Sequence, residues 1–515
     1  MQNNELILRR ESVLSPLRLP ELTQEQSVEL DYVLPDYYPD FFRLLHCTAE
    51  TAVTSQSIAD GTVQYALRVQ LHVLYCGEQA KTVQSVTQQL DYHGQMTLPP
   101  ESAAAENLQL SITAELSYLN CRAVSQRRID LRGAVRIRAQ LGGELRQEIL
   151  SGAEGLHMQT RSEPVQYISA LMRTEKRFSL SDEITLSAAQ PALLSVIRTQ
   201  TTLNVTETRV VAGKLVVKGE ANVSLLYTSS DGIESLNAVL PFSQIVEQDG
   251  MSDEMPAIVN AVLSEQSVTP EAENNGDIRL LHCDLQIILQ CTAVRTASAE
   301  LLTDLYSTVY PAEPQREQIT LLTLPVQINE HLQQKVMLTQ PDAVFTKVYA
   351  AWSTPENVQA AAGESGGTAL SGELHTCVLA ADAEDQPMML ESRTAFTWEL
   401  PQIRAVQGLP AVTVASCSYM LAGSDTVAVQ PELVLNGQIM QQQTLSLLTD
   451  VRADAGERLP QEDRFALRLY FGQPQESLWE IAKRYHTAES AIREENDIPA
   501  DVLTEPQMLL IPIVS

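Results

Sequence analysis

The most constraining feature of this chain is an internal repeat built on alternating apolar residues. Three pairs of residues recur at an offset of 152: Pro39 and Pro191, Gly61 and Gly213, and Tyr75 and Tyr227. Between the last two anchors of each copy, every second residue is mostly apolar. These are Val63, Tyr65, Leu67, Val69, Leu71, Val73 and Tyr75, and then Leu215, Val217, Gly219, Ala221, Val223, Leu225 and Tyr227. A period of two held this long predicts long strands with one buried face.

A third, weaker copy extends the pattern towards the C-terminus. Pro341, Gly372 and Phe396 take the places of Pro191, Gly219 and Phe242, and Gly94 matches Gly250 after a small insertion. Units of about 150 residues, rich in Val, Thr, Leu and Gln and broken by turn residues, are typical of β-sandwiches. We therefore predict a mainly β chain of three tandem β-sandwich-like repeats. Their expected bounds are 10–163, 164–312 and 313–456, with linkers at 141–164, 310–314 and 454–463.

The last fifty residues have a different pattern. A short strand is predicted over 466–471, and an amphipathic helix over 477–485 with Ser477 and Glu480 as a capping box. A second helix over 488–495 ends at Asn496, a residue that tolerates left-handed backbone, and a strand over 508–512 closes the segment. Residues 464–515 are thus predicted to form a small βααβ domain.

Charge and composition exclude several classes of function. The 515 residues carry 35 Lys and Arg against 65 Asp and Glu, a net charge of −30. Nucleic acid and anionic membranes both require clustered basic residues, so neither is an expected partner. The N-terminal segment MQNNELILRRES lacks the apolar core of a signal peptide, and no apolar stretch is long enough to be a transmembrane segment. We expect a cytoplasmic protein with reduced cysteines.

The sequence predicts no enzyme, metal or cofactor. Phosphate-loop, nucleophile-elbow and zinc-helix motifs are absent, and no CxxC pair occurs among the seven cysteines. Asp36 and Asp40 could form a carboxylate pair or a Ca²⁺ site, but turn chemistry is the favoured interpretation. The pentapeptide RLLHC occurs at 43–47 and again at 279–283. Because these positions are not equivalent in the repeat alignment, we interpret the match as coincidence.

The C-terminal segment resembles a LysM domain. The run SLWEIAKRY, Asn496 and the ending QMLLIP match the pattern of that family in order, with Gln475 and Pro506 where the family usually has Gly. The resemblance implies a shallow groove that binds N-acetylglucosamine polymers or a protein partner. The implied groove residues are Gln473, Pro474, Gln475, Glu476, Ser477, Leu478, Trp479, Ile498, Pro499, Ala500, Asp501 and Val502. For Trp479, both packing in the helix core and contact with a partner stay open.

The β-repeats resemble a domain-of-unknown-function family found in tandem in endospore-forming clostridia. Unit two carries its pattern as Ser181–Leu186, Pro241-Phe242-Ser243 and Asp304-Leu305-Tyr306-Ser307. Such repeats followed by one LysM domain are similar to clostridial spore-coat morphogenetic proteins of the SipL type. The resemblance implies a cytoplasmic scaffold in the mother cell, at the forespore surface, that docks the coat morphogenetic ATPase through LysM.

Two other functions stay open at this point. One is a cell-wall protein that binds peptidoglycan, and the other is a structural protein of the phage-tail type that carries LysM. The β-repeats are also expected to self-associate through exposed strand edges.

Overall fold

The computed structural model describes residues 5–77, 83–253, 255–272, 276–341, 343–403, 406–407, 410–460 and 467–513. Strands dominate this part of the chain, and the α-helices described there lie in the C-terminal segment. The predicted mainly β fold with a small C-terminal helical module is therefore confirmed. No helix in the described ranges is both long and apolar enough to span a bilayer.

The first β-unit consists of two antiparallel sheets that enclose an apolar core. One sheet is formed by β1 (Ile7–Arg18), β2 (Leu22–Val33), β6 (Glu106–Ser125) and β7 (Arg128–Glu154). The other is formed by β3 (Arg43–Ala59), β4 (Thr62–Cys76) and β5 (Val83–Thr97), and a short 3₁₀ turn, Pro100–Ala104, follows β5. The alternating residues of β4 fill the core between the sheets, as their period of two requires.

The third β-unit also has two sheets, whereas the strands of the second unit form one six-stranded sheet, joined where Leu193 pairs with Ile278. In the second, β8 (Met158–Thr185), β12 (Ala257–Ala272) and β13 (Ile278–Ser307) pair together, as do β9 (Leu193–Val211), β10 (Lys214–Ser229) and β11 (Gly232–Glu247). In the third, one sheet comprises β14 (Ala312–Gln333), β15 (Val336–Thr339), β19 (Val406–Gln407), β20 (Thr413–Leu421) and β21 (Thr426–Ala453). The other comprises β16 (Lys347–Ala362), β17 (Thr368–Ala381) and β18 (Pro387–Leu400).

Residues related by the offset of 152 have the same local geometry in the first two units. Asp60 and Gly61 join β3 to β4 with φ of 50° and 72°, and Ala212 and Gly213 join β9 to β10 with φ of 51° and 72°. Two positive φ values in a two-residue loop are the signature of the hairpin turn that matches strand twist. The hydroxyl of Tyr75 also donates to the Pro39 carbonyl at 3.0 Å, as that of Tyr227 does to Pro191 at 3.4 Å.

Glycine and an aromatic ring face each other across strands in every unit. Gly219 pairs with Phe242 and Gly372 with Phe396, each ring covering the glycine. In the first unit the order along the chain is reversed. The ring, Tyr65, lies on the earlier strand, β4, and covers Gly94 on the later strand, β5. The sequence match of Gly94 to Gly250 is therefore wrong. Gly250 lies in the turn that follows β11, with φ of 85°, where a left-handed backbone is required.

Six strand segments extend beyond the β-units to form a stalk. We define it as residues 7–18, 142–154, 158–170, 295–307, 312–322 and 442–453. Here β1 pairs with β7, β8 with β13 and β14 with β21, and the three ribbons share one apolar core. That core contains Val13, Ile149, Val165, Tyr167, Leu301, Ile319, Leu321 and Leu447.

The stalk corrects the predicted linkers. The predicted linker at 141–164 instead lies largely in β7 and β8, and the expected boundary between 163 and 164 falls inside β8. Gly143, which suggested a linker, serves close packing, because a Cβ there would lie 2.5 Å from that of Ala105. The turns at 155–157 and 308–311 join successive ribbons, and 454–460, from the third predicted linker, leave the tip of the stalk. Residues 461–463 of that linker lie outside the described ranges.

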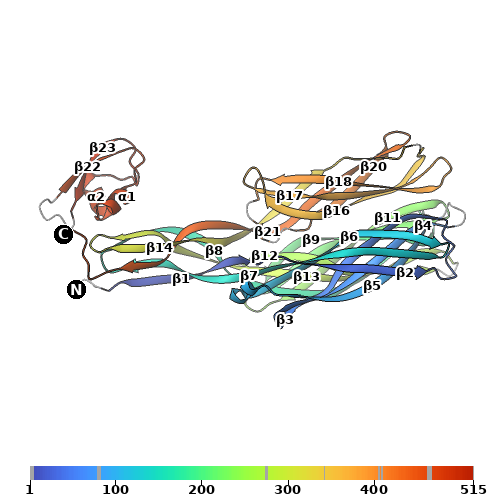
Figure 1. Cartoon of the computed structure of the whole chain (residues 1–515), viewed down its shortest axis with the longest axis horizontal. Coiled ribbons are helices and arrows are strands. Elements are labelled where there is room, and N and C mark those ends of the chain that lie inside the picture. Colours follow the sequence, from blue (N-terminus) through green and yellow to red (C-terminus); the bar gives the residue numbers. More distant parts are fainter. Residues whose placement is uncertain are drawn as a thin grey trace.

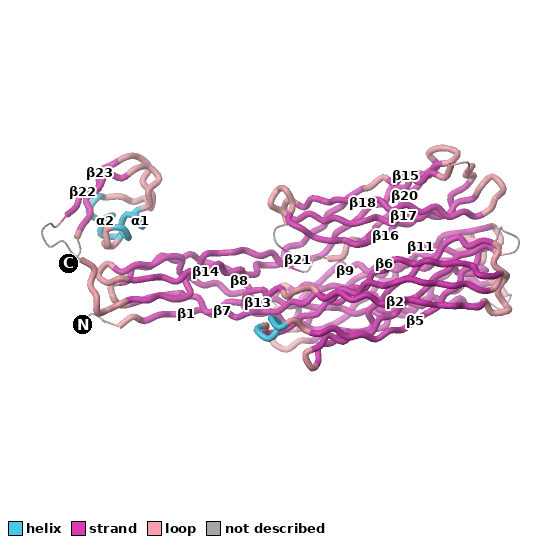
Figure 2. The backbone as a smooth tube through the Cα atoms, in the orientation of Figure 1, coloured by secondary structure: helices cyan, strands magenta, loops and turns pink. Residues whose placement is uncertain are grey.

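The molecule is elongated, with the β-units at one end and the C-terminal module at the tip of the stalk (Figure 1). The strands of the stalk run without a break from all three β-units (Figure 2). The C-terminal module is thus held far from the β-units, at the point where successive ribbons turn back.

The cross-strand contact between Gly94 and Tyr65 predicts a rescuable defect. A Cβ on Gly94 would lie 2.2 Å from the Tyr65 ring, so Gly94→Ala should destabilise the chain by about 1–3 kcal/mol. Adding Tyr65→Leu should recover part of that loss, because the three atoms nearest the new methyl all belong to the Tyr65 side chain. Denaturant unfolding of the double-mutant cycle measures this coupling.

The second unit supplies a matched control. In the Gly219→Ala chain, adding Phe242→Leu should restore a smaller share of the lost stability. The new Cβ would still lie 2.6 Å from the backbone oxygen of Asn204. Equal rescue in the two units, or none at Gly94, would contradict the explanation.

Candidate functional site

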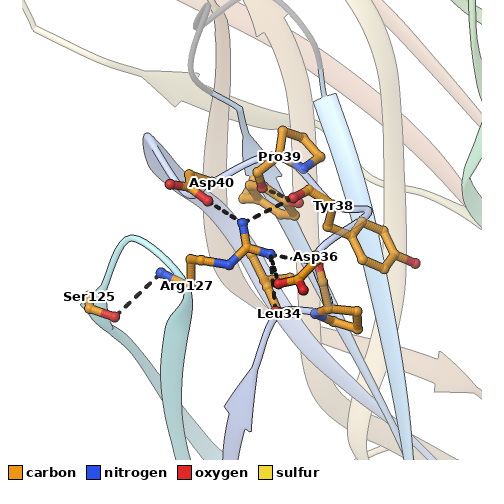
Figure 3. Close-up of polar contacts among 9 residues, drawn as sticks. Leu34, Asp36, Tyr38, Pro39, Asp40, Ser125 and Arg127 are labelled. Carbon is orange, nitrogen blue, oxygen red and sulfur yellow. Dashed lines mark hydrogen bonds and ion pairs between the residues drawn. The ribbon is translucent and has the colours of Figure 1, made fainter.

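The acidic-aromatic segment at 34–40 is organised by one arginine. Arg127 forms an ion pair with Asp40, donates to the carbonyls of Leu34 and Pro35 at 3.2 and 2.7 Å, and lies 3.7 Å from Asp36 (Figure 3). Arg279, its counterpart at the offset of 152, binds the carbonyls of the equivalent turn at 3.1 Å. Asp36 and Asp40 therefore lie in an arginine-stabilised turn, which supports turn chemistry over a Ca²⁺ site.

The C-terminal module is a compact βααβ unit. It comprises β22 (Leu467–Gly472), α1 (Leu478–Arg484), α2 (Glu489–Asn496) and β23 (Gln507–Pro512), and β22 pairs antiparallel with β23. Leu478, Ile481 and Ala482 of α1 are buried, as the predicted amphipathic face requires. The helices pack on the strands through a core that also contains Ile492, Leu503, Leu509 and Ile511.

Two predicted helix ends differ in detail. Ser477 precedes α1, but its side chain makes no capping hydrogen bond, and its backbone forms an isolated β-bridge with Val502. The left-handed residue after α2 is Asp497, with φ of 53°, whereas Asn496 is the last helical residue. The Asn496 side chain donates to and accepts from the backbone of Leu510, each at 2.7 Å, and so ties α2 to β23.

The two loops of the predicted groove lie side by side. The backbone of Gln475 donates to the Leu503 carbonyl at 2.7 Å, and Leu503 donates to Glu476 at 2.9 Å. Leu478 donates to the Asp501 carbonyl at 2.9 Å. The structure thus brings 473–477 and 498–502 together, and their use as a binding groove stays a prediction.

Side chains of the module fix the shape of both loops. Gln475 has φ of 70°, the left-handed conformation that the usual glycine would adopt, so this substitution keeps the turn. The Glu476 carboxylate accepts the backbone N–H of Gln473 and the Tyr470 hydroxyl, and these bonds hold the pKa of Glu476 below its usual range. Arg493 holds the other loop by donating to the Pro499 carbonyl at 3.0 Å.

Leu478 and Trp479 do not present side chains to this groove. Leu478 is fully buried in the module core. The Trp479 indole packs edge-on against Tyr306 of the stalk with ring centroids 4.9 Å apart, and its Nε1 donates to Asp304 at 2.7 Å. Trp479 therefore contacts the chain's own stalk, a third possibility beside helix packing and contact with a partner.

Asp304 is the polar centre of this docking contact. Its carboxylate is buried and accepts Lys483 Nζ at 2.8 Å in addition to Trp479, and it also contacts Arg316 of β14. Burial opposes ionisation of Asp304, but hydrogen bonds from Lys483 and Trp479 outweigh it and hold the pKa below its usual range. The Tyr306 hydroxyl adds a bond to the Thr487 carbonyl at 2.8 Å. The Asp-x-Tyr-Ser motif of the sequence thus supplies the residues that dock the module.

Sequence reasoning missed an apolar face on the module. Leu469, Phe471 and Met508 are 70, 61 and 63% exposed, and Leu467 is 42% exposed. Phe471 pairs directly with Met508 across β22 and β23, so these side chains share the outer face of the small sheet. We call Leu467, Leu469, Phe471 and Met508 the sheet patch. The apolar alternation of Leu467, Leu469 and Phe471 was the signal for it.

The docking contact predicts that Asp304→Ala releases the module from the stalk. The change leaves the Trp479 N–H and the Lys483 ammonium without their shared acceptor, and breaking such a buried pair costs about 3–5 kcal/mol. We expect a larger radius of gyration by small-angle scattering and faster proteolysis near residue 460. Asp450→Ala, which removes an exposed partner of Arg10, should change neither. An unchanged radius in Asp304→Ala would refute the contact.

Comparison with known families identifies two segments of the chain. Residues 193–271 match the model described as the SipL, SPOCS domain, and residues 473–512 match the LysM domain. The first match begins with β9 and ends one residue before the end of β12, within the second β-unit. Searches of curated proteins and of solved structures gave no significant match. The chain thus combines a SipL-type SPOCS domain with a C-terminal LysM domain, which confirms the resemblance read from its sequence.

Proposed function

We propose that this protein is a non-enzymatic scaffold in assembly of the endospore coat. The observation that carries the proposal is the presence of a SipL SPOCS domain and a LysM domain in one chain, which marks a spore-coat-related protein. The geometry supports a scaffold, because the LysM domain is mounted at the tip of a stalk and the β-units form a separate body (Figure 1).

The LysM domain acts in this proposal as a docking module for the coat morphogenetic ATPase. The sheet patch supports a protein partner, since exposed apolar side chains clustered on one small sheet are typical of interaction surfaces. The net charge of −30 favours a partner whose surface is neutral or basic. Docking would take place in the mother-cell cytoplasm, at the forespore surface.

The first test substitutes the sheet patch in the full chain. Phe471→Ser should lower capture of the coat ATPase from sporulating cells at least tenfold, as expected for a central apolar contact. It should also disperse a fluorescently tagged chain from the forespore. Val239→Ser, which changes a similarly exposed apolar residue on β11, should leave both unchanged. Circular dichroism must show that the Phe471→Ser chain is folded, and forespore localisation that persists in this folded variant would contradict the proposal.

A second candidate function is binding of peptidoglycan by the same domain. The observation in its favour is the retained turn at Gln475, which leaves the two groove loops in register despite the missing glycine. Sedimentation of the full chain with purified peptidoglycan separates the two functions. Binding that is weakened by Pro499→Ala and unaffected by Phe471→Ser would assign the groove to glycan. A chain that stays in the supernatant would exclude this function.

A further inference from the structure

A cluster of metal-ligand side chains lies where the first and third β-units meet. His46 of β3 lies beside Cys377 of β17 and Glu391 of β18, with one ligand atom of each within 4.8 Å of the others. Nδ1 of His46 is 2.5 Å from a Glu391 carboxylate oxygen. His46 and Cys377 are buried, whereas the Glu391 side chain is 43% exposed and leaves a route from solvent.

A second histidine completes the set. Nε2 of His375 lies 3.5 Å from the Cys377 sulfur and 3.3 Å from Glu391. The other ring nitrogen, Nδ1, lies 3.2 Å from Glu356, and Glu356 in turn lies 3.5 Å from Arg393. The far nitrogen of a metal-ligating histidine almost always has an outer-shell partner, and a carboxylate such as Glu356 is one of the common ones.

Strand geometry places these four side chains together. Cys377 and Glu391 are direct cross-strand partners, and His375 lies two residues before Cys377, so all three share one face of the sheet. His46 comes from the first β-unit, where a β-bulge in β3 directs it towards them. The pairing shows the bulge, because Leu44 pairs with Tyr75 while His46 pairs with the adjacent Leu74. Bulges redirect side chains in this way.

The second RLLHC pentapeptide shows that this placement is specific. In β13 the histidine of the same five residues, His282, is 41% exposed and Cys283 is buried in the core of the second unit. In β3 the histidine is buried against the third unit instead. Both cysteines thus face the core of their own unit and both histidines face away from it, and His46 differs because the third unit packs over it.

We propose that His46, His375, Cys377 and Glu391 bind one Zn²⁺ ion that joins the first β-unit to the third. One thiolate, two imidazoles and a carboxylate form a donor set that suits Zn²⁺. Ligand atoms around tetrahedral zinc lie roughly 3.3–3.8 Å apart, so His46, Cys377 and Glu391, whose ligand atoms lie within 4.8 Å of one another, need to close by about 1 Å, and His375 moves in beside them. On binding, the Cys377 thiol and any protonated imidazole release their protons to solvent. This site goes beyond the proposed scaffold function, and it would fix the relative position of two β-units.

The test measures metal binding by the purified full chain. We expect one equivalent of Zn²⁺ to remain after gel filtration, and Zn²⁺ to raise the unfolding temperature. Bound Co²⁺ should show a thiolate charge-transfer band that Cys377→Ser abolishes. His46→Gln should weaken Zn²⁺ binding at least tenfold, whereas His282→Gln, in the second RLLHC, should leave it unchanged.

Other outcomes overturn the site. A chain that retains no stoichiometric zinc, or a cobalt complex without a thiolate band, would show that the cluster is a hydrogen-bonded network alone. Zinc retention that is equal in wild type, His46→Gln and Glu391→Gln would show adventitious binding elsewhere. If Cys377→Ser does not fold, the cobalt spectrum of the wild-type chain and the two other variants decide the question.

Discussion

Antiparallel pairing of a few very long strands is the interaction on which the rest of this structure depends. β7, β8, β13 and β21 each run from a β-unit into the stalk, so one continuous ladder of backbone hydrogen bonds spans both. A two-stranded ribbon alone is marginally stable in water. Three ribbons become stable here because they bury a common core that includes Ile149, Leu301 and Leu447. Each β-unit therefore contributes to a shared element that none could form alone.

The stalk also explains why the LysM domain is held in one position. Its contact area with the stalk centres on a single carboxylate, Asp304, which satisfies Trp479 and Lys483 together. Loss of this carboxylate would leave both donors without their shared acceptor, so the contact forms as a unit or is lost as a unit. Because Trp479 is used in this way, the groove loops and the sheet patch are the surfaces that we propose for other molecules.

Much of the β-unit architecture could be predicted because its signals are local. The hairpin glycines Gly61 and Gly213 and the alternation along β4 and β10 each reflect a turn or one strand face, which the neighbouring residues determine. The linker predicted at 141–164 failed for the opposite reason. Gly142, Gly143 and Gly152 indicate a break by composition, yet they lie in β7, which pairs with β1, more than a hundred residues earlier, and with β6. Only the paired strand reveals that Gly143 serves close packing.

The sequence by itself determined the strand periods, the hairpin turns and the βααβ order of the LysM domain, because these depend on residues close together in the chain. Tertiary structure alone decided which faces meet. It set Asp304 against Trp479, 175 residues away, and His46 against Glu391, 345 residues away. The two RLLHC segments show the physical reason. In both segments the cysteine faces the core of its own unit and the histidine faces away from it, but the distant third unit packs over His46, whereas His282 stays exposed.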